Sequence, residues 1–332
     1  MINTQQQLQY FLNNISKDSL LAIDTEFKRI NTYHPELCLV QIATNKFIDC
    51  IDILAISNLE PLFKKLYDAR TKWVVHSARQ DIEALFNLSN RIPSALFDTQ
   101  VAASLLNFPL QVSYQSLTKQ LQNVHLEKKH TRFDWTLRPL PKDVLEYALD
   151  DVRYLLPMHK LLENMLISEN KIQWLDEEIT PLLEQKLYKP NIKQICKKTK
   201  GLSKIEAKAQ KKAINLIYWR ESIAQKENKP RKWIMSDEKL LDYACGKLRL
   251  SHASEKLFNK FVDQNFNMPT FLETLKPQKP LSNDEKLQKN ELQNTINKLA
   301  LKYNIAPELI GSAKSLVKFI RNDSTSLLQN GW

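Results

Sequence analysis

Glycine is scarce in this sequence, with only four glycines among 332 residues. Nucleotide-binding loops of the Rossmann and P-loop kinds need several glycines within a few positions, because the backbone must approach the phosphates closely. No such loop fits this chain. The scarcity therefore excludes a dinucleotide-dependent oxidoreductase and a P-loop nucleotide hydrolase.

Cysteine and long apolar runs are also lacking. The four cysteines are scattered and include no Cys-x-x-Cys pair, so the sequence indicates neither a disulfide framework nor a zinc site. No apolar run approaches the roughly 18 residues of a membrane span. The first 16 residues lack the basic-then-apolar order of a signal peptide. We therefore predict a cytoplasmic protein with no membrane partner.

Positive charge is concentrated in the second half of the chain. Residues 1–165 hold 18 Lys and Arg against 18 Asp and Glu, whereas residues 166–332 hold 30 against 19. Between residues 186 and 212, ten lysines face a single acid, Glu206. Such a stretch favours a polyanion as partner. A solvated, lysine-rich helix surface is the alternative.

The first half has the hydrophobic pattern of an α/β domain. Short apolar runs predict strands at residues 20–27, 37–44, 46–50 and 73–76. Helical patterns occupy residues 7–15, 59–67, 81–88, 97–106, 114–121 and 144–164. Residues 125–141 lack periodicity and contain two prolines, which predicts a loop. Together these elements predict a mixed sheet with helices packed around it.

From about residue 166 onward the patterns are helical. Helices are predicted at residues 172–187, 204–226, 237–248, 255–264, 284–303 and 307–321, with linkers at 188–201 and 277–283. A chain of 332 residues is too long for one compact core. We therefore predict three domains, at residues 1–185, 200–276 and 284–332.

Two acids end the first predicted strand. Asp24 and Glu26 lie two positions apart, so a strand places both side chains on the same face. Adjacent like charges are destabilising, and a divalent cation would offset that repulsion. An exposed strand end with two solvated acids is the alternative.

Two further acidic groups follow along the chain. Tyr147 and Asp151 stand four residues apart on a predicted helix and therefore share a face. Asp81 follows the predicted strand at 73–76 and opens a helix. By itself Asp81 reads as a helix cap that interacts with free backbone N–H groups and the helix dipole.

Taken together, these groups resemble the three exonuclease motifs of the DEDD superfamily. A histidine-branch member would carry His five residues before the last Asp; Glu146 stands there, while Tyr147 stands four before it, as in the tyrosine branch. Residues 21–27, 32–41, 97–100, 134–140 and 147–158 are similar to the ribonuclease D family. The resemblance covers residues 1–165 and implies a ribonuclease H-like α/β exonuclease domain.

The resemblance also implies the chemistry. Two divalent ions, Mg²⁺ or Mn²⁺, would be held by Asp24, Glu26, Asp81 and Asp151, with Asp24 bridging both. Tyr147 would orient the attacking water. The family motif selects Asp151 over the neighbouring Asp150, and it gives no metal role to Asp98 or Asp134. Two such ions stabilise the attacking and leaving oxygens in phosphodiester hydrolysis.

The second half resembles another module of the same family. Residues 205–276 are similar to a helicase-and-RNase-D C-terminal (HRDC) domain, and residues 284–332 correspond to a second one. The family pattern continues beyond Gly331-Trp332, which predicts that this last domain is truncated. The fold expected for residues 200–332 is therefore all-α. Trp219 is predicted to lie in its core, and Ser236 to cap a helix. Five basic residues are candidates for RNA contacts: Lys211, Lys212, Lys229, Arg231 and Lys232.

The family resemblance implies a 3′→5′ exoribonuclease that releases 5′-mononucleotides. The substrates it implies are tRNA precursors and other small structured RNAs with single-stranded 3′ ends, and we expect a monomer. Two alternatives remain open, a DNA 3′→5′ exonuclease and a catalytically inactive RNA-binding protein. The presence of all five site residues argues against the inactive protein.

Overall fold

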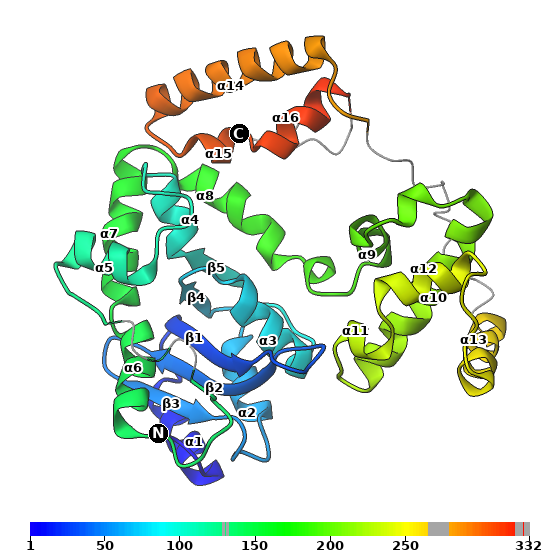
Figure 1. Cartoon of the computed structure of the whole chain (residues 1–332). Helices are drawn as coiled ribbons and strands as arrows, with labels where there is room; N and C mark the ends of the chain where they lie inside the picture. The colour runs from blue at the N-terminus through cyan, green and yellow to red at the C-terminus, as the bar shows by residue number, and fades with distance from the viewer. Residues whose placement is uncertain (128–129, 131–132, 265–278, 323–327, 329–332) are drawn as a thin grey trace. The chain divides into compact units, whose positions relative to one another are not determined.

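The computed structural model (Figure 1) describes residues 1–127, 130, 133–264, 279–322 and 328. The chain forms two compact units. Unit 1 comprises Met1–Lys28, Glu36–Tyr188 and Leu281–Trp332, and unit 2 comprises Arg29–Pro35 and Lys189–Pro280. The three-domain division at residues 1–185, 200–276 and 284–332 remains a prediction.

Unit 1 is built on one five-stranded sheet in the order β3-β2-β1-β4-β5. Its strands are β1 (Leu20–Lys28), β2 (Glu36–Ala43), β3 (Ile48–Asp52), β4 (Lys72–Val75) and β5 (Ala95–Asp98). Strands β1, β2 and β3 pair antiparallel, whereas β1, β4 and β5 pair parallel. The predicted mixed sheet is therefore present.

Side-chain alternation gives the antiparallel half of the sheet two different faces. Ile23, Val40 and Ile42 belong to the main core of unit 1, which residues from helices α1 (Gln5–Asn14), α2 (Glu60–Leu66), α3 (Arg79–Ser89), α4 (Thr99–Ser104), α5 (Tyr114–Gln122), α7 (Leu155–Ser168) and α8 (Ile172–Ile179) complete. Helix α6 (Lys142–Arg153) contacts β1, β2 and β3. Leu39 and Cys50 pack with Val144 and Ala148 of α6 in a smaller cluster. Polar residues on that face therefore lie between the strands and α6.

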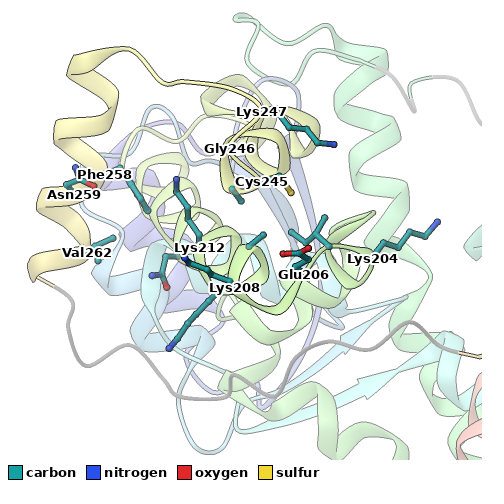
Figure 2. A pocket seen from close by; sticks show the side chains of 15 residues that line it. Lys204, Glu206, Lys208, Lys212, Cys245, Gly246, Lys247, Phe258, Asn259 and Val262 are labelled. Carbon is teal, nitrogen blue, oxygen red and sulfur yellow. The ribbon is translucent and has the colours of Figure 1, made fainter.

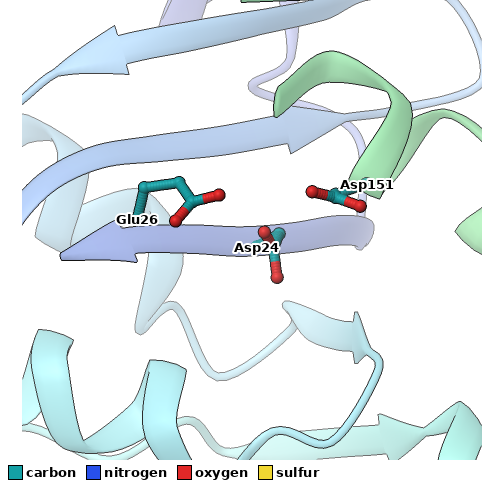
Figure 3. Close-up of side chains that lie close together, drawn as sticks. All are labelled: Asp24, Glu26 and Asp151. Atoms are coloured by element: carbon teal, nitrogen blue, oxygen red, sulfur yellow. The ribbon is translucent and has the colours of Figure 1, made fainter. Parts of the chain in front are cut away.

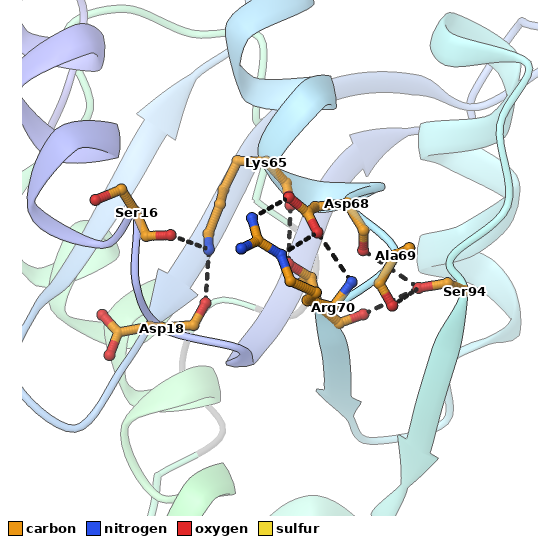
Figure 4. A network of polar contacts seen from close by, with 8 residues as sticks. Ser16, Asp18, Lys65, Asp68, Ala69, Arg70 and Ser94 are labelled. Atoms are coloured by element: carbon orange, nitrogen blue, oxygen red, sulfur yellow. Dashed lines mark hydrogen bonds and ion pairs between the residues drawn. The ribbon is translucent and has the colours of Figure 1, made fainter.

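Polar contacts tie together the starts of the parallel strands (Figure 4). The Lys65 ammonium donates to the carbonyls of Ser16 (3.3 Å) and Asp18 (2.6 Å), just before β1. The Ser94 hydroxyl, just before β5, donates to the carbonyl of Asp68 (3.3 Å), in the segment between α2 and β4. The carboxyl ends of parallel strands meet at one edge of the sheet, so these contacts fix the edge opposite to the one where Asp98 and the start of α3 lie.

Four predicted helices of unit 1 differ from the observed elements. The predicted helix 307–321 is interrupted at Gly311 and Ser312, so that two helices, Pro307–Ile310 and Ala313–Ile320, take its place. Residues 97–106 were predicted as one helix, but Phe97 belongs to β5, and Asp98 caps α4 instead. The predicted helix 144–164 is interrupted at Tyr154, between α6 and α7. The predicted helix 172–187 ends as α8 at Ile179, and two 3₁₀ turns follow, the first with Pro181 near its start. Proline lacks the N–H that would continue the helix.

The last part of the chain belongs to unit 1. Its helices are α14 (Asn283–Tyr303), α15 (Pro307–Ile310) and α16 (Ala313–Ile320). A capping box formed by Ser282 and Glu285 starts α14. The buried Lys171 ammonium donates to the carbonyls of Leu105 (2.8 Å) and Asn304 (3.0 Å), so it links the end of α14 to the region around α4.

Unit 2 is helical, as predicted. It contains α9 (Ile192–Lys198), α10 (Ala207–Lys226), α11 (Arg231–Ile234), α12 (Asp237–Ala244) and α13 (His252–Gln264). Helix α9 lies within the predicted linker 188–201, where Ile195 and Cys196 pack into the core of unit 2. Trp219 also lies in this core, and Ser236 caps α12, both as predicted.

The segment Arg29–Pro35, between β1 and β2, groups with unit 2. The Tyr33 hydroxyl donates to Glu221 Oε2 (2.8 Å), and Asn228 Oδ1 accepts from the backbone N–H groups of Tyr33 and His34.

Across the part of the chain that the structure describes, no helix combines the length and the apolar character that a bilayer crossing requires.

Candidate active site

Three carboxylates of unit 1 converge beneath helix α6 (Figure 3). Asp24 and Glu26 project from β1, and Asp151 projects from α6. One ligand oxygen from each lies within 4.8 Å of the other two. The strand alternation and the four-residue spacing on the helix predicted these directions, so local sequence accounts for the geometry of this group.

Helix α6 brings Asp151 and Tyr147 over the sheet because apolar positions next to them on the helix pack against it. Val144, Ala148 and Val152 are buried against the sheet and its neighbouring helices. Asp150, one residue from Asp151, forms an ion pair with Arg153 on the surface of the helix instead. The structure therefore brings Asp151 to the other acids and leaves Asp150 outside that group.

Asp81 is the fourth acid, and it lies beside the three rather than among them. It stands in the first turn of α3, it is buried, and its Oδ1 accepts a hydrogen bond of 2.6 Å from the Thr25 hydroxyl. Thr25 lies between Asp24 and Glu26 on β1. Thr25 and Asp81 are 56 positions apart in the sequence, so their hydrogen bond is a tertiary contact. It brings Asp81 next to the strand that carries Asp24 and Glu26.

The pKa values of all four acids are raised, first by burial and then by one another. Burial raises the pKa of Glu26 to about 10, with further contributions from Asp24, Asp151 and Asp81. Burial and the nearby Asp150 and Asp81 raise the pKa of Asp151 to about 7. The pKa values of Asp24 and Asp81 lie well above the ordinary range for the same reason. Among the described residues, every charged group that acts on these pKa values is another carboxylate.

This arrangement suits a divalent cation. Carboxylate oxygens are the ligands that Mg²⁺ prefers in proteins, and the group carries no histidine or cysteine ligand among the described residues. Like charges buried together oppose each other's ionisation, and the positive charge of a bound cation would remove that opposition. Asp24, Glu26 and Asp151 form a site that could hold such an ion.

Tyr147 lies beside the acids with its ring in an aromatic group. Its ring stacks on Trp135 at 6.5 Å between centroids and meets His130 edge-on at 5.7 Å. Burial, Asp151 and Glu26 raise the pKa of the Tyr147 phenol above its usual value. The hydroxyl therefore stays protonated at neutral pH and can donate a hydrogen bond.

The loop after α5 holds Trp135 in this place. As predicted, the described residues within 125–141 form neither helix nor strand. Arg138 makes two hydrogen bonds of 2.6 Å to the buried Asp52 carboxylate at the end of β3, and it also donates to the Trp135 carbonyl. These bonds hold Trp135, the residue on which Tyr147 stacks, to the end of β3.

Two positioning residues were missed from sequence. The buried Asp98 carboxylate accepts hydrogen bonds from the backbone N–H groups of Ser77 (3.0 Å) and Ala78 (2.8 Å), in the turn that leads to α3 and Asp81. The buried Tyr114 hydroxyl donates to the Asp150 carbonyl (3.0 Å), where α6 ends. The position of Asp98 directly before a helix could have identified it from sequence as a helix cap. No local sequence pattern predicts that the Tyr114 hydroxyl contacts the Asp150 carbonyl.

A basic pocket lies on unit 2 (Figure 2). Its volume is about 860 Å³, and it is lined by residues from the first half of α10, the end of α12 and α13. Five lysines line it: Lys204, Lys208, Lys211, Lys212 and Lys247. The Lys212 ammonium lies 3.9 Å from the centroid of the Tyr243 ring. The pocket thus includes two of the five predicted RNA-contact residues.

Of the other three predicted RNA-contact residues, Arg231 and Lys232 lie in α11 and Lys229 lies just before it. Lys229 and Lys232 are exposed, whereas Arg231 Nε lies 3.5 Å from a carboxylate oxygen of the fully buried Glu221. Trp233, next to Lys232, is 61% exposed. An exposed tryptophan beside lysines is a surface on which a nucleic-acid base can stack. Helical periodicity alone did not reveal that this side chain is exposed.

Known proteins that are similar to this chain in sequence are nucleases. The model of a 3′-5′ exonuclease family matches residues 1–167. Ribonuclease D of Bartonella henselae is 31% identical over 355 aligned residues, which cover 100% of this chain and 86% of that protein. Ribonuclease D of Gluconacetobacter diazotrophicus is 35% identical, but the alignment covers 74% of this chain and 62% of that protein.

Solved structures give the same fold for nearly the whole chain. The crystal structure of Escherichia coli RNase D, an exoribonuclease involved in structured RNA processing, superposes with a TM-score of 0.83 at 23% identity and covers 100% of this chain and 94% of that chain. The catalytic core of RRP6 from Trypanosoma brucei superposes with a TM-score of 0.58 at 19% identity, covering 97% and 79%. The predicted fold class, a mixed-sheet exonuclease domain followed by a helical region, is confirmed.

The repulsion among the acids predicts a stabilising substitution. Asp24→Asn removes one charge from this group of acids. In EDTA at pH 8 we therefore expect the variant to melt about 2–4 °C above the wild-type protein, which corresponds to a gain of about 1 kcal/mol in the free energy of unfolding. The sign follows from the raised pKa values of Asp151 and Glu26. A carboxyl whose pKa is raised in the folded state costs the protein stability as pH rises from its unfolded-state pKa, about 4, to its folded-state pKa, here about 7 for Asp151 and about 10 for Glu26. The gain should therefore shrink at pH 5.

Differential scanning calorimetry of both proteins with EDTA, at pH 5 and pH 8, measures this effect. Asp176→Asn, on α8, is the matched control and should show no pH-dependent gain. A wild-type melting temperature equal to or above that of Asp24→Asn at pH 8 would show that the group is not repulsive.

Proposed function

The chain belongs to the ribonuclease D family of 3′–5′ exonucleases, and we propose that it shortens RNA from the 3′ end with two divalent metal ions. It is a hydrolase of phosphodiester bonds. The observation that carries the proposal is the convergence of Asp24, Glu26 and Asp151 within 4.8 Å, with Asp81 hydrogen-bonded to the same strand. The products would be 5′-mononucleotides.

The four acids would hold the metal ions. Asp24, Glu26 and Asp151 form the closer group and suit one ion, while Asp81, which reaches β1 through Thr25, suits a second ion that shares Asp24. When bound, Mg²⁺ or Mn²⁺ supplies the positive charge that stabilises the attacking and leaving oxygens and lowers the pKa of water. Thr25 holds the Asp81 carboxylate in one orientation.

Tyr147 would position the reacting groups without removing a proton. Its pKa is raised by burial and by Asp151 and Glu26, so the phenol keeps its hydrogen. A protonated hydroxyl beside the carboxylates can donate to the attacking water or to a phosphate oxygen. Stacking on Trp135 restricts the ring to one direction, which favours this positioning role.

The proposed substrates are tRNA precursors and other small structured RNAs with single-stranded 3′ ends. Relatives named ribonuclease D and the excess of basic residues after residue 165 support RNA as the polyanion. In this proposal the protein acts as a monomer in the cytoplasm. Two HRDC-like domains, at residues 200–276 and 284–332, complete the proposed organisation.

Unit 2 offers two surfaces for RNA. The pocket between α10, α12 and α13 gathers five lysines around one hollow, which suits phosphate groups. Near α11, Lys232 and Trp233 offer a charge and an exposed ring side by side. Arg231 is the weaker candidate of the predicted set, because the Glu221 carboxylate already neutralises it.

The function is tested with 5′-labelled single-stranded RNA and matched DNA, incubated with Mg²⁺, Mn²⁺ or EDTA. We expect a ladder that shortens from the 3′ end on RNA, is weak on DNA and is absent in EDTA. Asp24→Asn should reduce the rate by at least about 100-fold, because loss of a metal ligand removes charge stabilisation worth several kcal/mol.

Asp176→Asn serves here too as a matched control, since it changes the same side chain far along the sequence on α8. Intact RNA under every metal condition would contradict exonuclease activity. Faster shortening of DNA than of RNA would favour a DNA exonuclease.

The two RNA surfaces predict different salt responses. Replacing Lys208 and Lys211 with alanine should weaken RNA binding and flatten the dependence of log affinity on log salt by about 0.7 for each phosphate that the variant no longer neutralises. Trp233→Ala should weaken binding about tenfold, because a base can no longer stack there, and leave that slope unchanged. Fluorescence anisotropy between 50 and 300 mM KCl measures both quantities.

Lys160→Ala, on α7 of unit 1, is the control for a lysine outside unit 2. An unchanged slope for the double lysine variant would remove the pocket from the RNA interface. An unchanged affinity for Trp233→Ala would remove the stacking role.

A further inference from the structure

A glutamine side chain lies next to the metal-binding acids and is not used by the mechanism above. Gln41 on β2 pairs directly with Asp24 on β1 in the antiparallel register. Directly opposed residues of an antiparallel pair project from the same face, with neighbouring Cβ atoms. On its other side Gln41 pairs with Cys50 of β3. Gln41 therefore stands in a row between Asp24 and Cys50.

This row lies beneath helix α6, away from solvent. Helix α6 contacts β1, β2 and β3, and its Ala148 packs in one cluster with Leu39 and Cys50, which share the face of Gln41. Gln41 is 0% exposed. Burial and then the Asp49 carboxylate raise the pKa of the Cys50 thiol, and Asp24 contributes a smaller increase, as expected for groups on the same face.

The Gln41 amide has no hydrogen-bond partner within the part of the chain that the structure describes. Both Nε2 and Oε1 are buried and unpaired. Buried side-chain amides are paired in the large majority of cases, so an unpaired one calls for a partner or a function. The neighbouring acids include an obvious acceptor, because an ionised carboxylate accepts hydrogen bonds and the amide NH₂ donates two.

The two aspartates differ in the support they receive. Asp81 accepts a hydrogen bond from the Thr25 hydroxyl at 2.6 Å. The Asp24 carboxylate accepts a backbone hydrogen bond from Thr25, and none of the described side chains is recorded as donating to it. Carboxylates that bind metals are usually held by outer hydrogen bonds that fix their orientation. Gln41 is the residue placed to supply this bond for Asp24.

We propose that Gln41 is a positioning residue of the metal centre, whose side-chain Nε2 donates a hydrogen bond to the Asp24 carboxylate when that carboxylate holds a divalent cation. The inference rests on the proposed metal-dependent function. The amide carries no net charge, so it orients Asp24 without competing with the cation.

The test is metal binding to Gln41→Met, measured without substrate. Methionine keeps the length and approximate volume of glutamine but cannot donate. Isothermal titration calorimetry with Mn²⁺ should show affinity reduced about 10- to 100-fold, the usual effect of removing an outer hydrogen bond. The melting temperature in EDTA should be equal or higher, because an apolar side chain replaces an unpaired amide.

A second variant and a control separate this role from simple packing. Gln41→Leu also removes the NH₂ donor and adds no charge, so it should also bind Mn²⁺ more weakly. Gln210→Met changes a buried glutamine of unit 2 and should leave Mn²⁺ affinity unchanged. In the RNA assay, Gln41→Met should need at least tenfold more Mn²⁺ for half-maximal rate, while its rate at saturating Mn²⁺ returns to within threefold of wild type.

Mn²⁺ affinity of Gln41→Met within twofold of wild type would overturn the inference. If neither variant folds, a crystal structure of the wild-type protein with Mn²⁺ decides. Nε2 within 3.2 Å of an Asp24 oxygen supports the role, and a separation above 3.5 Å rejects it. Wild-type protein that binds no Mn²⁺ at all would instead contradict the proposed function.

Discussion

The mutual repulsion of four clustered carboxylates, one buried and three partly buried, is the constraint on which this structure depends. Asp24, Glu26, Asp81 and Asp151 raise one another's pKa values, and burial raises them further. A fold gains nothing in stability from such a group, so the scaffold must hold the acids together against their repulsion. A bound cation would convert the same repulsion into binding affinity.

The scaffold meets this demand with elements fixed from several directions. The mixed sheet places Asp24 and Glu26 on a central strand, and α6 covers that strand with apolar side chains around Asp151. Asp98 holds the turn before α3, and Arg138 holds the loop that carries Trp135. Asp98 is buried and bonded to backbone N–H groups, and the partly exposed Arg138 is bonded to the buried Asp52 carboxylate. Buried polar groups cost little stability when they are fully paired.

Local sequence patterns predicted much of this arrangement. They did not predict the features that depend on contacts between residues far apart in the sequence. Strand alternation gave the shared face of Asp24 and Glu26, and helical spacing gave that of Tyr147 and Asp151. Asp81 could be read only as a cap until the family resemblance linked it to the others, because its contact with Thr25 spans 56 positions.

Other features depend on pairing that no local pattern reports. Phe97 and Asp98, the second half of strand β5, were predicted as the start of a helix, because the pairing of this short strand with β4 is a tertiary contact. Gln41 looks like an ordinary strand residue until its register with Asp24 is known. The exposure of Trp233 and the lysine-lined pocket on unit 2 likewise follow from the packing of α10 to α13, not from periodicity.

The most direct test of the central claim is the number of protons released when metal binds. Mn²⁺ is titrated into the protein at pH 7 by calorimetry, in two buffers with different heats of ionisation. Since the pKa of Glu26 is about 10 and that of Asp151 about 7 without metal, binding should release about one proton or more per protein. Identical binding enthalpies in the two buffers would mean that the acids are already ionised without metal. That result would contradict the claim that they repel one another strongly enough to stay protonated.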